Sequence, residues 1–371
     1  MTRHGGIAAL ALAAALLTAC APAAEPTSSP SAAPSAPASS SPMPSAPASP
    51  PPSALVPDQR RVVAEDLVAP WSIAFAGDRA LVSERDTGRV LEVMDGATRE
   101  VGTIPGVQAH GEGGLLGLAV REEHLYVYLT AGAENRIERY ELVGEPGALE
   151  LGARETILGG LPAAGNHNGG RIAFGPDGML YATVGDAGQP DAAQDRESLG
   201  GKILRLTADG EVPADNPFAA SLVYSYGHRN PQGLAWAADG TLYASEFGQD
   251  TWDELNVIEP GANYGWPETE GVAGRDGMAD PILQWRPAEA SPSGIAIVGD
   301  TLYLANLRGA RLRAVPLDDP AAAVDHLVGE VGRVRDVALA PSGEVWILTN
   351  NTDGRGAPRP GDDRIIALGL R

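Results

Sequence analysis

The sequence predicts an all-β protein, a six-bladed β-propeller with four-stranded antiparallel blades. An apolar triplet with alanine at its centre recurs six times, a tight turn follows most copies, and their spacing of roughly 40 to 60 residues is that of propeller blades. The segments between them show strand signals and no helical periodicity. The triplets are Ile73-Ala74-Phe75, Leu118-Ala119-Val120, Ile172-Ala173-Phe174, Leu234-Ala235-Trp236, Ile295-Ala296-Ile297 and Val337-Ala338-Leu339.

Each triplet is expected to lie in the first strand of a blade. An Asp-Gly, Gly-Asp or Ser-Gly pair after most triplets predicts a hairpin turn, and Leu-Tyr or Val-Trp usually opens the second strand. Equivalent loops of all blades gather at one end of the central channel. The repeat therefore predicts where a functional site would lie.

The N-terminus predicts a leader that is removed from the mature protein. Arg3-His4, an apolar run from Ile7 to Leu17 and the small residues before Cys20 indicate a lipoprotein signal peptide over residues 1–20, with a lipobox ending at Cys20. Cys20 is the only cysteine, so no disulfide can form within one chain. Its position favours lipidation over a buried free thiol.

Composition separates the leader from the folded part. Residues 21–57 are almost entirely proline, alanine and serine, which predicts a disordered, extended spacer. The propeller is expected to occupy residues 58–371, held at the outer face of the cell membrane by a lipid on Cys20. The formal net charge of −21 makes nucleic acid a poor partner.

Polar residues stand about five to seven positions ahead of several triplets, in loops expected to face one funnel. They are Glu112, His167, Arg229 and Arg333, with Asn230 and Arg335 beside them, and the next loops on the same side add Gly248, Gln249 and Arg308. Arginines that converge in an acidic chain repel one another. A bound anion, such as a small polycarboxylate or a phosphate, is therefore implied.

The residues alone leave the chemistry of this funnel open. His167, in a glycine-rich loop, could act as a general base toward a substrate hydroxyl or could bond to loop backbone. Arg229 could stabilise developing negative charge or could pair with a neighbouring carboxylate. Residues 245–266 are rich in acidic side chains and glycines, which suits calcium but is also typical of a solvated turn.

Six motifs, in this combination and order, resemble those of a known family. They are Gly111–Gly117, Asn166-His167, Gly200–Leu206, Gly227–Gly233, Asn263–Pro267 and Arg333–Asp336. The chain is similar over nearly all of its folded part to the soluble glucose dehydrogenase and aldose sugar dehydrogenase family. The members are six-bladed propellers that use pyrroloquinoline quinone (PQQ) and calcium.

The resemblance implies a role for each residue of the funnel. His167 would take the proton of the sugar's anomeric hydroxyl while hydride passes to the quinone, which gives the lactone. Arg229 would stabilise the quinone oxygen that becomes negative. The further cofactor contacts would come from Glu112, Asn230, Arg308, Arg333 and Arg335, with Arg308 where the best-known members have a lysine. The anion implied by the arginines would then be the tricarboxylate cofactor.

By the same resemblance, backbone oxygens of Gly248 and Gln249 hold the catalytic calcium. Gln249 replaces the family's common proline, and Glu254 and the backbone of Tyr264 match a further calcium position. Glu112 stands where the glucose-oxidising members have a glutamine, so it could pair with an arginine, bind metal or be protonated. Substrate preference is the property that this replacement is most expected to alter.

The leading hypothesis is a PQQ- and calcium-dependent enzyme that oxidises an aldose and passes electrons to an unknown acceptor outside the cytoplasm. A metal-dependent lactonase on the same fold remains an alternative, as does a non-catalytic envelope module that binds a saccharide or a protein. Lactonase propellers usually gather carboxylate and asparagine ligands around a central metal. The channel end predicted here is dominated by arginine and histidine instead.

Overall fold

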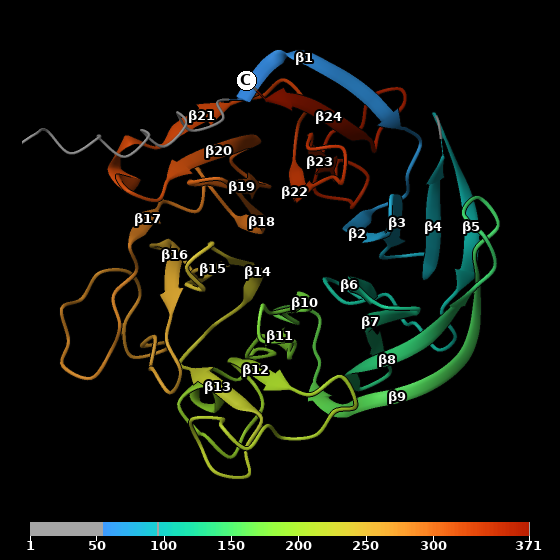
Figure 1. Ribbon diagram of the computed structural model, residues 1–371. Coiled ribbons are helices and arrows are strands. Elements are labelled where there is room, and N and C mark those ends of the chain that lie inside the picture. Colours follow the sequence, from blue (N-terminus) through green and yellow to red (C-terminus); the bar gives the residue numbers. More distant parts are fainter. Residues whose placement is uncertain (1–54, 95, 371) are drawn as a thin grey trace, which may run out of the picture. The chain divides into compact units, whose positions relative to one another are not determined.

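The computed structural model describes residues 55–94 and 96–370, whose strands form six four-stranded antiparallel sheets (Figure 1). The predicted six-bladed β-propeller is confirmed. The first three blades comprise β2 (Pro70–Ala76), β3 (Arg79–Glu84), β4 (Arg89–Met94) and β5 (Ala97–Thr103); β6 (Leu115–Arg121), β7 (His124–Ala131), β8 (Glu134–Val143) and β9 (Glu150–Pro162); and β10 (Ile172–Phe174), β11 (Leu180–Val184), β12 (Lys202–Leu206) and β13 (Val223–Tyr226).

The other three blades follow the same plan. They comprise β14 (Pro231–Trp236), β15 (Leu242–Glu246), β16 (Asp253–Ile258) and β17 (Leu283–Trp285); β18 (Pro292–Val298), β19 (Thr301–Asn306), β20 (Arg311–Pro316) and β21 (Val324–His326); and β22 (Val334–Leu339), β23 (Val345–Thr349), β24 (Ile365–Leu370) and β1 (Leu55–Ala64). Within the described residues the helical segments are two short 3₁₀ turns, η1 (Pro190–Ala193) and η2 (Pro320–Ala322).

The six alanine triplets lie where the repeat predicts them, in the strand of each blade nearest the axis (β2, β6, β10, β14, β18 and β22; Figure 1). Because inner strands of neighbouring blades converge, a small central side chain limits crowding there. Ala74, Ala119 and Ala173 line a cavity of about 290 Å³ along the channel. The recurring alanine is therefore a consequence of propeller geometry.

The ring closes by pairing the two ends of the described chain. β1 lies antiparallel to β24, with Arg61 opposite Ala367 and Val62 opposite Ile366. The last blade thus takes three strands from the C-terminal end and one from the N-terminal end, which protects an otherwise open sheet edge. The predicted leader, Cys20 and most of the predicted spacer lie outside the described residues. No helix in the described part is long and apolar enough to cross a membrane.

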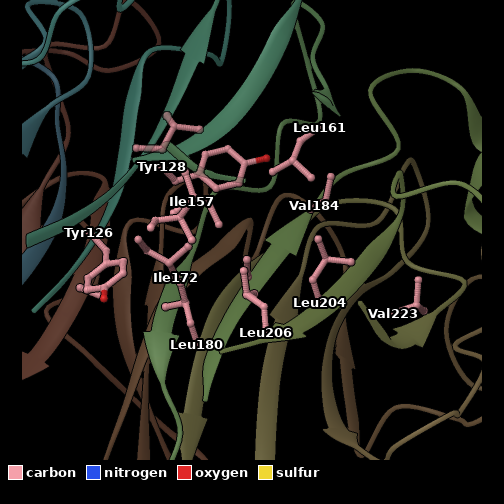
Figure 2. Close-up of a cluster of buried hydrophobic side chains, with 14 of the residues drawn as sticks. Tyr126, Tyr128, Ile157, Leu161, Ile172, Leu180, Val184, Leu204, Leu206 and Val223 are labelled. Carbon is pink, nitrogen blue, oxygen red and sulfur yellow. The ribbon is translucent and has the colours of Figure 1, made fainter. Parts of the chain in front are cut away.

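The hydrophobic core is divided among the spaces between blades. The largest cluster joins the second and third blades and includes Tyr128, Ile172 and Leu204, each 2% exposed or less (Figure 2). Burying one such side chain fully contributes about 1.5–3 kcal/mol. Similar clusters fill the other inter-blade spaces, so each blade buries its apolar side chains against its two neighbours.

Lys202 is a buried cation that ties η1 to the third blade. Its ammonium donates to the carbonyl oxygens of Ala192 (2.7 Å), Ala193 (3.1 Å) and Gly200 (2.6 Å). Burial lowers the pKa of Lys202 to about 8. The folded protein therefore releases this proton at a lower pH than the unfolded chain, where lysine titrates near 10.4.

This difference predicts a pH-dependent stability. Well below pH 8 the Lys202 amine is protonated in both the folded and the unfolded state, so the folded state bears the full cost of burying an ammonium group. Between pH 8 and about 10 the amine loses its proton in the folded state but keeps it in the unfolded chain, so the free energy of unfolding rises. The free energy of unfolding of the wild type, relative to Lys202→Met, should increase by about 2 kcal/mol over this window. Urea denaturation of both proteins at several pH values measures it. A difference that does not change with pH would contradict the prediction.

Candidate functional site

A cavity of about 400 Å³ at one end of the channel gathers the residues expected to face the funnel. It is lined by Glu112, His167, Arg229, Asn230, Gly248, Gln249, Arg308, Arg333 and Arg335. Each comes from a loop before an inner strand, from the start of that strand, or from the loop between the second and third strands of a blade. The structure therefore brings these residues together. Glu254 and Tyr264 are not among its lining residues; they line a small adjoining cavity that shares Arg229, Phe247 and Gly248 with it.

His167 is held in one orientation by a carboxylate that the sequence did not single out. Its Nδ1 lies 2.7 Å from Oδ1 of buried Asp186. Burial opposes ionisation of Asp186, but bonds from His167, the Gly188 N–H and the Trp266 indole bring its pKa below the usual range. Because an ionised carboxylate only accepts hydrogen bonds, Nδ1 carries the ring's proton. Nε2 is then unprotonated, and in this structure it accepts a hydrogen bond from Asn166 Nδ2 at 3.0 Å.

Glu112 connects the His167 loop to an arginine. Its Oε2 accepts the His167 backbone N–H at 2.9 Å, and its Oε1 lies 3.3 Å from the Arg355 guanidinium. His167 has a left-handed backbone conformation (φ +56°), which is strained for a residue other than glycine. The bond from its N–H to Glu112 is one of the contacts that maintain this conformation. Of the three possibilities for Glu112, pairing with an arginine is the one observed. A Cβ at Gly111 would overlap the Gly165 carbonyl, so the two loops approach closely because position 111 is glycine.

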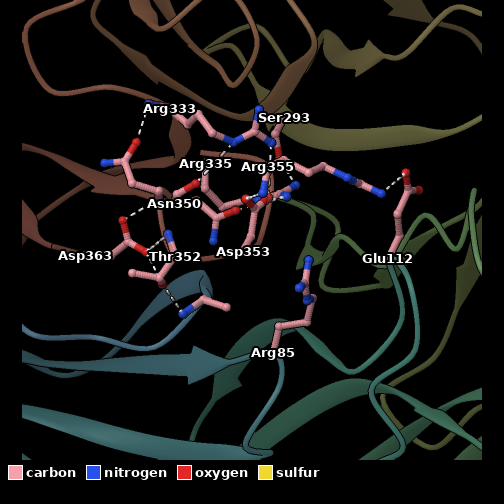
Figure 3. Close-up of polar contacts among 12 residues, drawn as sticks. Arg85, Glu112, Ser293, Arg333, Arg335, Asn350, Thr352, Asp353, Arg355 and Asp363 are labelled. Atoms are coloured by element: carbon pink, nitrogen blue, oxygen red, sulfur yellow. Dashed lines mark hydrogen bonds and ion pairs between the residues drawn. The ribbon is translucent and has the colours of Figure 1, made fainter. Parts of the chain in front are cut away.

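The cavity concentrates guanidinium groups (Figure 3). Arg333 pairs with buried Asp353 at 3.1 Å, whereas Arg335 bonds to Oε1 of Gln232 at 2.8 Å. Burial lowers the pKa of Arg335 to about 9. Arg308 has no side-chain hydrogen bond or ion pair with the described residues. Sequence reasoning missed two further arginines of this lining, Arg85 and Arg355.

Two of these arginines keep buried donors without a partner. The Nε atoms of Arg229 and Arg335 are buried and make no hydrogen bond within the described residues. An unsatisfied buried donor costs free energy, more so when it is charged. Arginine recognises carboxylates through paired N–H groups. The donors, the net positive lining and the cavity together fit a compact polycarboxylate such as PQQ.

A fully buried chain of side chains fixes the backbone beside Arg229. Ser225 Oγ lies 2.8 Å from His228 Nε2, and His228 Nδ1 lies 2.7 Å from Oε2 of Glu246. The other oxygen of Glu246 accepts the Arg229 backbone N–H. Ser225 and His228 have no exposed surface, so this serine–histidine–glutamate arrangement cannot reach a substrate. It positions the loop that carries Arg229.

The loop with Gly248 and Gln249 lies on the cavity wall beside a carboxylate. Oδ1 of Asp253 accepts the Gly248 N–H at 2.9 Å, and its Oδ2 accepts the Ser291 N–H at 2.7 Å. Burial raises the pKa of Asp253 to about 6. Asp253 therefore joins the fourth and fifth blades at the cavity. Its acidic character was visible in the sequence, but its position was not.

Glu254 and Tyr264 lie at a second, very small cavity of about 10 Å³, also lined by Glu246 and Glu270. Burial and the neighbouring Glu246 raise the pKa of Glu254 to about 8. A hard cation bound between Glu246 and Glu254 would offset the repulsion between their negative charges. Among residues 55–94 and 96–370, no three acidic, histidine or cysteine side chains are grouped to hold a metal. A cation at either cavity would therefore need backbone carbonyl oxygens.

Comparison with known proteins gives consistent matches. The sequence model of the Glucose / Sorbosone dehydrogenase family matches residues 67–358. The solved structure of the PQQ-bound aldose sugar dehydrogenase from Streptomyces coelicolor is 50% identical, covering 84% of this chain and 97% of its own, with a TM-score of 0.81. A putative oxidoreductase (glucose dehydrogenase) from Thermus thermophilus is 40% identical, covering 84% and 99%, with a TM-score of 0.78. The aldose sugar dehydrogenase of Escherichia coli is 30% identical over 346 residues, 79% of this chain and 90% of that protein.

Proposed function

The chain belongs to the glucose/sorbosone dehydrogenase family, and from this premise we propose that it is a PQQ- and calcium-dependent oxidoreductase that converts an aldose to its lactone. The observation that carries the proposal is one cavity with two complementary parts. Its guanidinium groups include the unpartnered Nε atoms of Arg229 and Arg335, and its imidazole, His167, is oriented by Asp186. The first part suits the cofactor and the second suits a proton transfer.

Each part of the cavity has a distinct task in this proposal. Arg308, Arg333 and Arg335 would hold the carboxylates of the cofactor, while Arg229 and Asn230 would contact its quinone end. When bound, PQQ supplies the acceptor for the sugar's hydride, and calcium on the Gly248 and Gln249 carbonyls withdraws charge from that acceptor.

His167 does the protein's own chemistry. Its Nε2 accepts the proton of the anomeric hydroxyl as the C–H bond breaks, and Asp186 stabilises the imidazolium that forms. Glu112 holds the left-handed loop in place through the His167 N–H. A lactonase would instead need a metal gathered by side chains in the channel, and the described residues group no such set. The dehydrogenase reaction therefore gives a role to both the arginines and the histidine of this cavity, whereas the lactonase reaction would need a metal site instead.

The test is reconstitution of the purified protein with PQQ and calcium, followed by dye reduction with a panel of aldoses. Saturable activity that needs both components is expected. Arg308→Ala should weaken PQQ binding about tenfold or more, the effect of one lost charge-assisted contact. Arg61→Ala is the control, because it removes the same charge from β1, where Arg61 pairs with Glu344 and does not line the cavity. A folded protein that binds no PQQ would refute the proposal.

We also propose that the protein is anchored outside the cytoplasm by a lipid on Cys20. The leader pattern that precedes this sole cysteine supports the proposal. The Pro/Ala/Ser-rich stretch would then separate the propeller from the membrane. Cys20→Ser should move the protein from the membrane fraction to the soluble fraction, and an unchanged distribution would contradict the anchor.

A further inference from the structure

One carboxylate holds most of the loop that carries Gly248 and Gln249. This loop, residues 247–252, connects β15 to β16. Oε1 of Glu270 accepts three of its backbone N–H groups, those of Gln249 (2.7 Å), Thr251 (3.1 Å) and Trp252 (3.0 Å). Glu270 itself comes from the long connection between β16 and β17, and is distant in sequence from the loop. A single oxygen thus replaces the ladder of bonds that a strand would have.

These bonds fix the peptide planes that carry the Gly248, Asp250 and Thr251 carbonyls, and leave the Gln249–Asp250 plane to be restrained only through its neighbours. The Gly248–Gln249 peptide is trans, because the cis bonds of the described chain are Trp266–Pro267 and Asp362–Asp363. In a trans peptide the N–H and the preceding C=O point to opposite sides. Since the Gln249 N–H points to Glu270, the Gly248 carbonyl is turned away from Glu270. The same holds for the carbonyl that precedes Trp252. The carboxylate therefore gathers donors on one side of the loop and leaves acceptors on the other.

The approach of Glu270 to the loop depends on two glycines. A Cβ at Gly248 would overlap the Trp252 carbonyl and lie 2.6 Å from Oε1 of Glu270. A Cβ at Gly271 would overlap the Trp252 ring. The Gly271 N–H donates to Oε1 of Glu254 at 2.7 Å, which fixes the residue after Glu270. Glu270 can therefore approach the loop this closely only because positions 248 and 271 lack a Cβ.

We propose that Glu270 is a positioning residue that orients the Gly248 carbonyl for cation binding and restrains the loop of residues 247–252 that carries the neighbouring Gln249 carbonyl. The inference rests on the proposed calcium role of those carbonyls. Oε1 of Glu270 already accepts three hydrogen bonds, more than its two lone pairs, so this oxygen has none left for a cation. The Glu270→Gln variant decides whether Oε2 serves as a charged ligand. Glu270 acts through the peptide planes, and its loss raises the entropy that the loop must lose when the cation binds.

The test compares Glu270→Ala, Glu270→Gln and a matched control, Glu268→Ala. Glu268 lies in the same connection, carries the same charge and pairs with exposed Arg275, so its loss changes net charge equally without touching the loop. Two quantities are measured on the full protein freed of metal and cofactor: hydrogen exchange of a peptide covering residues 247–252, and the affinity for added calcium by calorimetry. Neither readout depends on turnover.

Glu270→Ala should speed exchange of the loop amides about tenfold or more and weaken calcium binding by a similar factor. Glu270→Gln should stay near wild type, because its amide oxygen still accepts N–H groups, and Glu268→Ala should match wild type in both measurements. Wild-type exchange in Glu270→Ala overturns the inference, as does equal loss of calcium affinity in Glu270→Gln and Glu270→Ala, which would make Glu270 a charged ligand. If the wild type binds no calcium while exchange still responds, the proposed function fails and the loop role of Glu270 stands.

Discussion

Replacing His167 by alanine should lower kcat for aldose oxidation by about 10²–10⁴-fold, the usual contribution of a positioned general base. PQQ and calcium binding should be retained, because the arginines and the 247–252 loop are untouched. The effect follows from geometry: Nδ1 is committed to Asp186 at 2.7 Å, so only Nε2 can take the sugar's proton. Steady-state kinetics of the reconstituted enzyme, with PQQ binding measured in parallel, provides the comparison.

Two further variants define the origin of this loss. Asp186→Asn keeps the size of the side chain but no longer requires a proton on Nδ1, so an intermediate loss of kcat is expected. His124→Ala removes a histidine at the start of β7, outside the cavity, and should leave kcat unchanged. If His167→Ala retained kcat within a few-fold of wild type, another group would have to be the base.

Replacing Asp336 by alanine should destabilise the fold by about 3–5 kcal/mol, because it removes the only carboxylate paired with the buried Arg171 guanidinium among the described residues and leaves it the Gln232 carbonyl and the Ser72 hydroxyl. Asp336 lies near the channel axis, 3% exposed, and its Oδ2 accepts from Arg171 at 3.0 Å and from the Ile73 N–H at 2.9 Å. These groups belong to three different blades. Arg171 also lies over the Trp71 ring, 4.4 Å from its centroid, between the two cavities of the channel.

Urea denaturation of the purified protein measures this effect. Asp336→Asn retains an acceptor for the Ile73 N–H and removes only the charge, so this variant should be less destabilised than Asp336→Ala. It allows the measurement to be made even if the alanine variant does not fold. Glu330→Ala is the control: its ion pair with Arg60 is about half exposed, and such pairs contribute about 0–1 kcal/mol. A loss at Asp336 no larger than that of the control would show that the blades do not depend on this contact.

The propeller could be predicted because its elements are specified locally. A triplet such as Ile295-Ala296-Ile297, the Gly-Asp turn after it and the Leu-Tyr that opens the next strand lie within ten residues of one another, and a similar order recurs in most blades. Hairpin formation depends on turn residues and alternation, both of which are sequence properties. The positions of His167, Arg229 and Arg333 ahead of their strands followed from this repeat, and all three line the cavity.

Contacts between blades could not be predicted in the same way. Asp186 lies 19 residues after His167 in an unremarkable Gly-Asp-Ala segment, and Arg355 meets Glu112 only because the ring closes. The Arg335–Gln232 bond spans 103 residues. Such pairs depend on the angle between sheets and on the paths of long loops, to which no short motif corresponds. Glu254 and Tyr264, which the resemblance assigned to a further calcium position, line a second small cavity whose wall is formed partly by the β16–β17 connection.

The sequence by itself determined the number of blades, the end of the channel where the polar loops gather, and the residue types available there. These depend on local hydrogen bonding and on alternation along each strand, which act over a few residues. Only the tertiary structure decided which nitrogen of His167 is unprotonated, which arginines keep unpartnered donors, and that Glu270 holds the 247–252 loop. Each depends on distances between groups from different segments, and those distances exist only once the blades have packed around the axis.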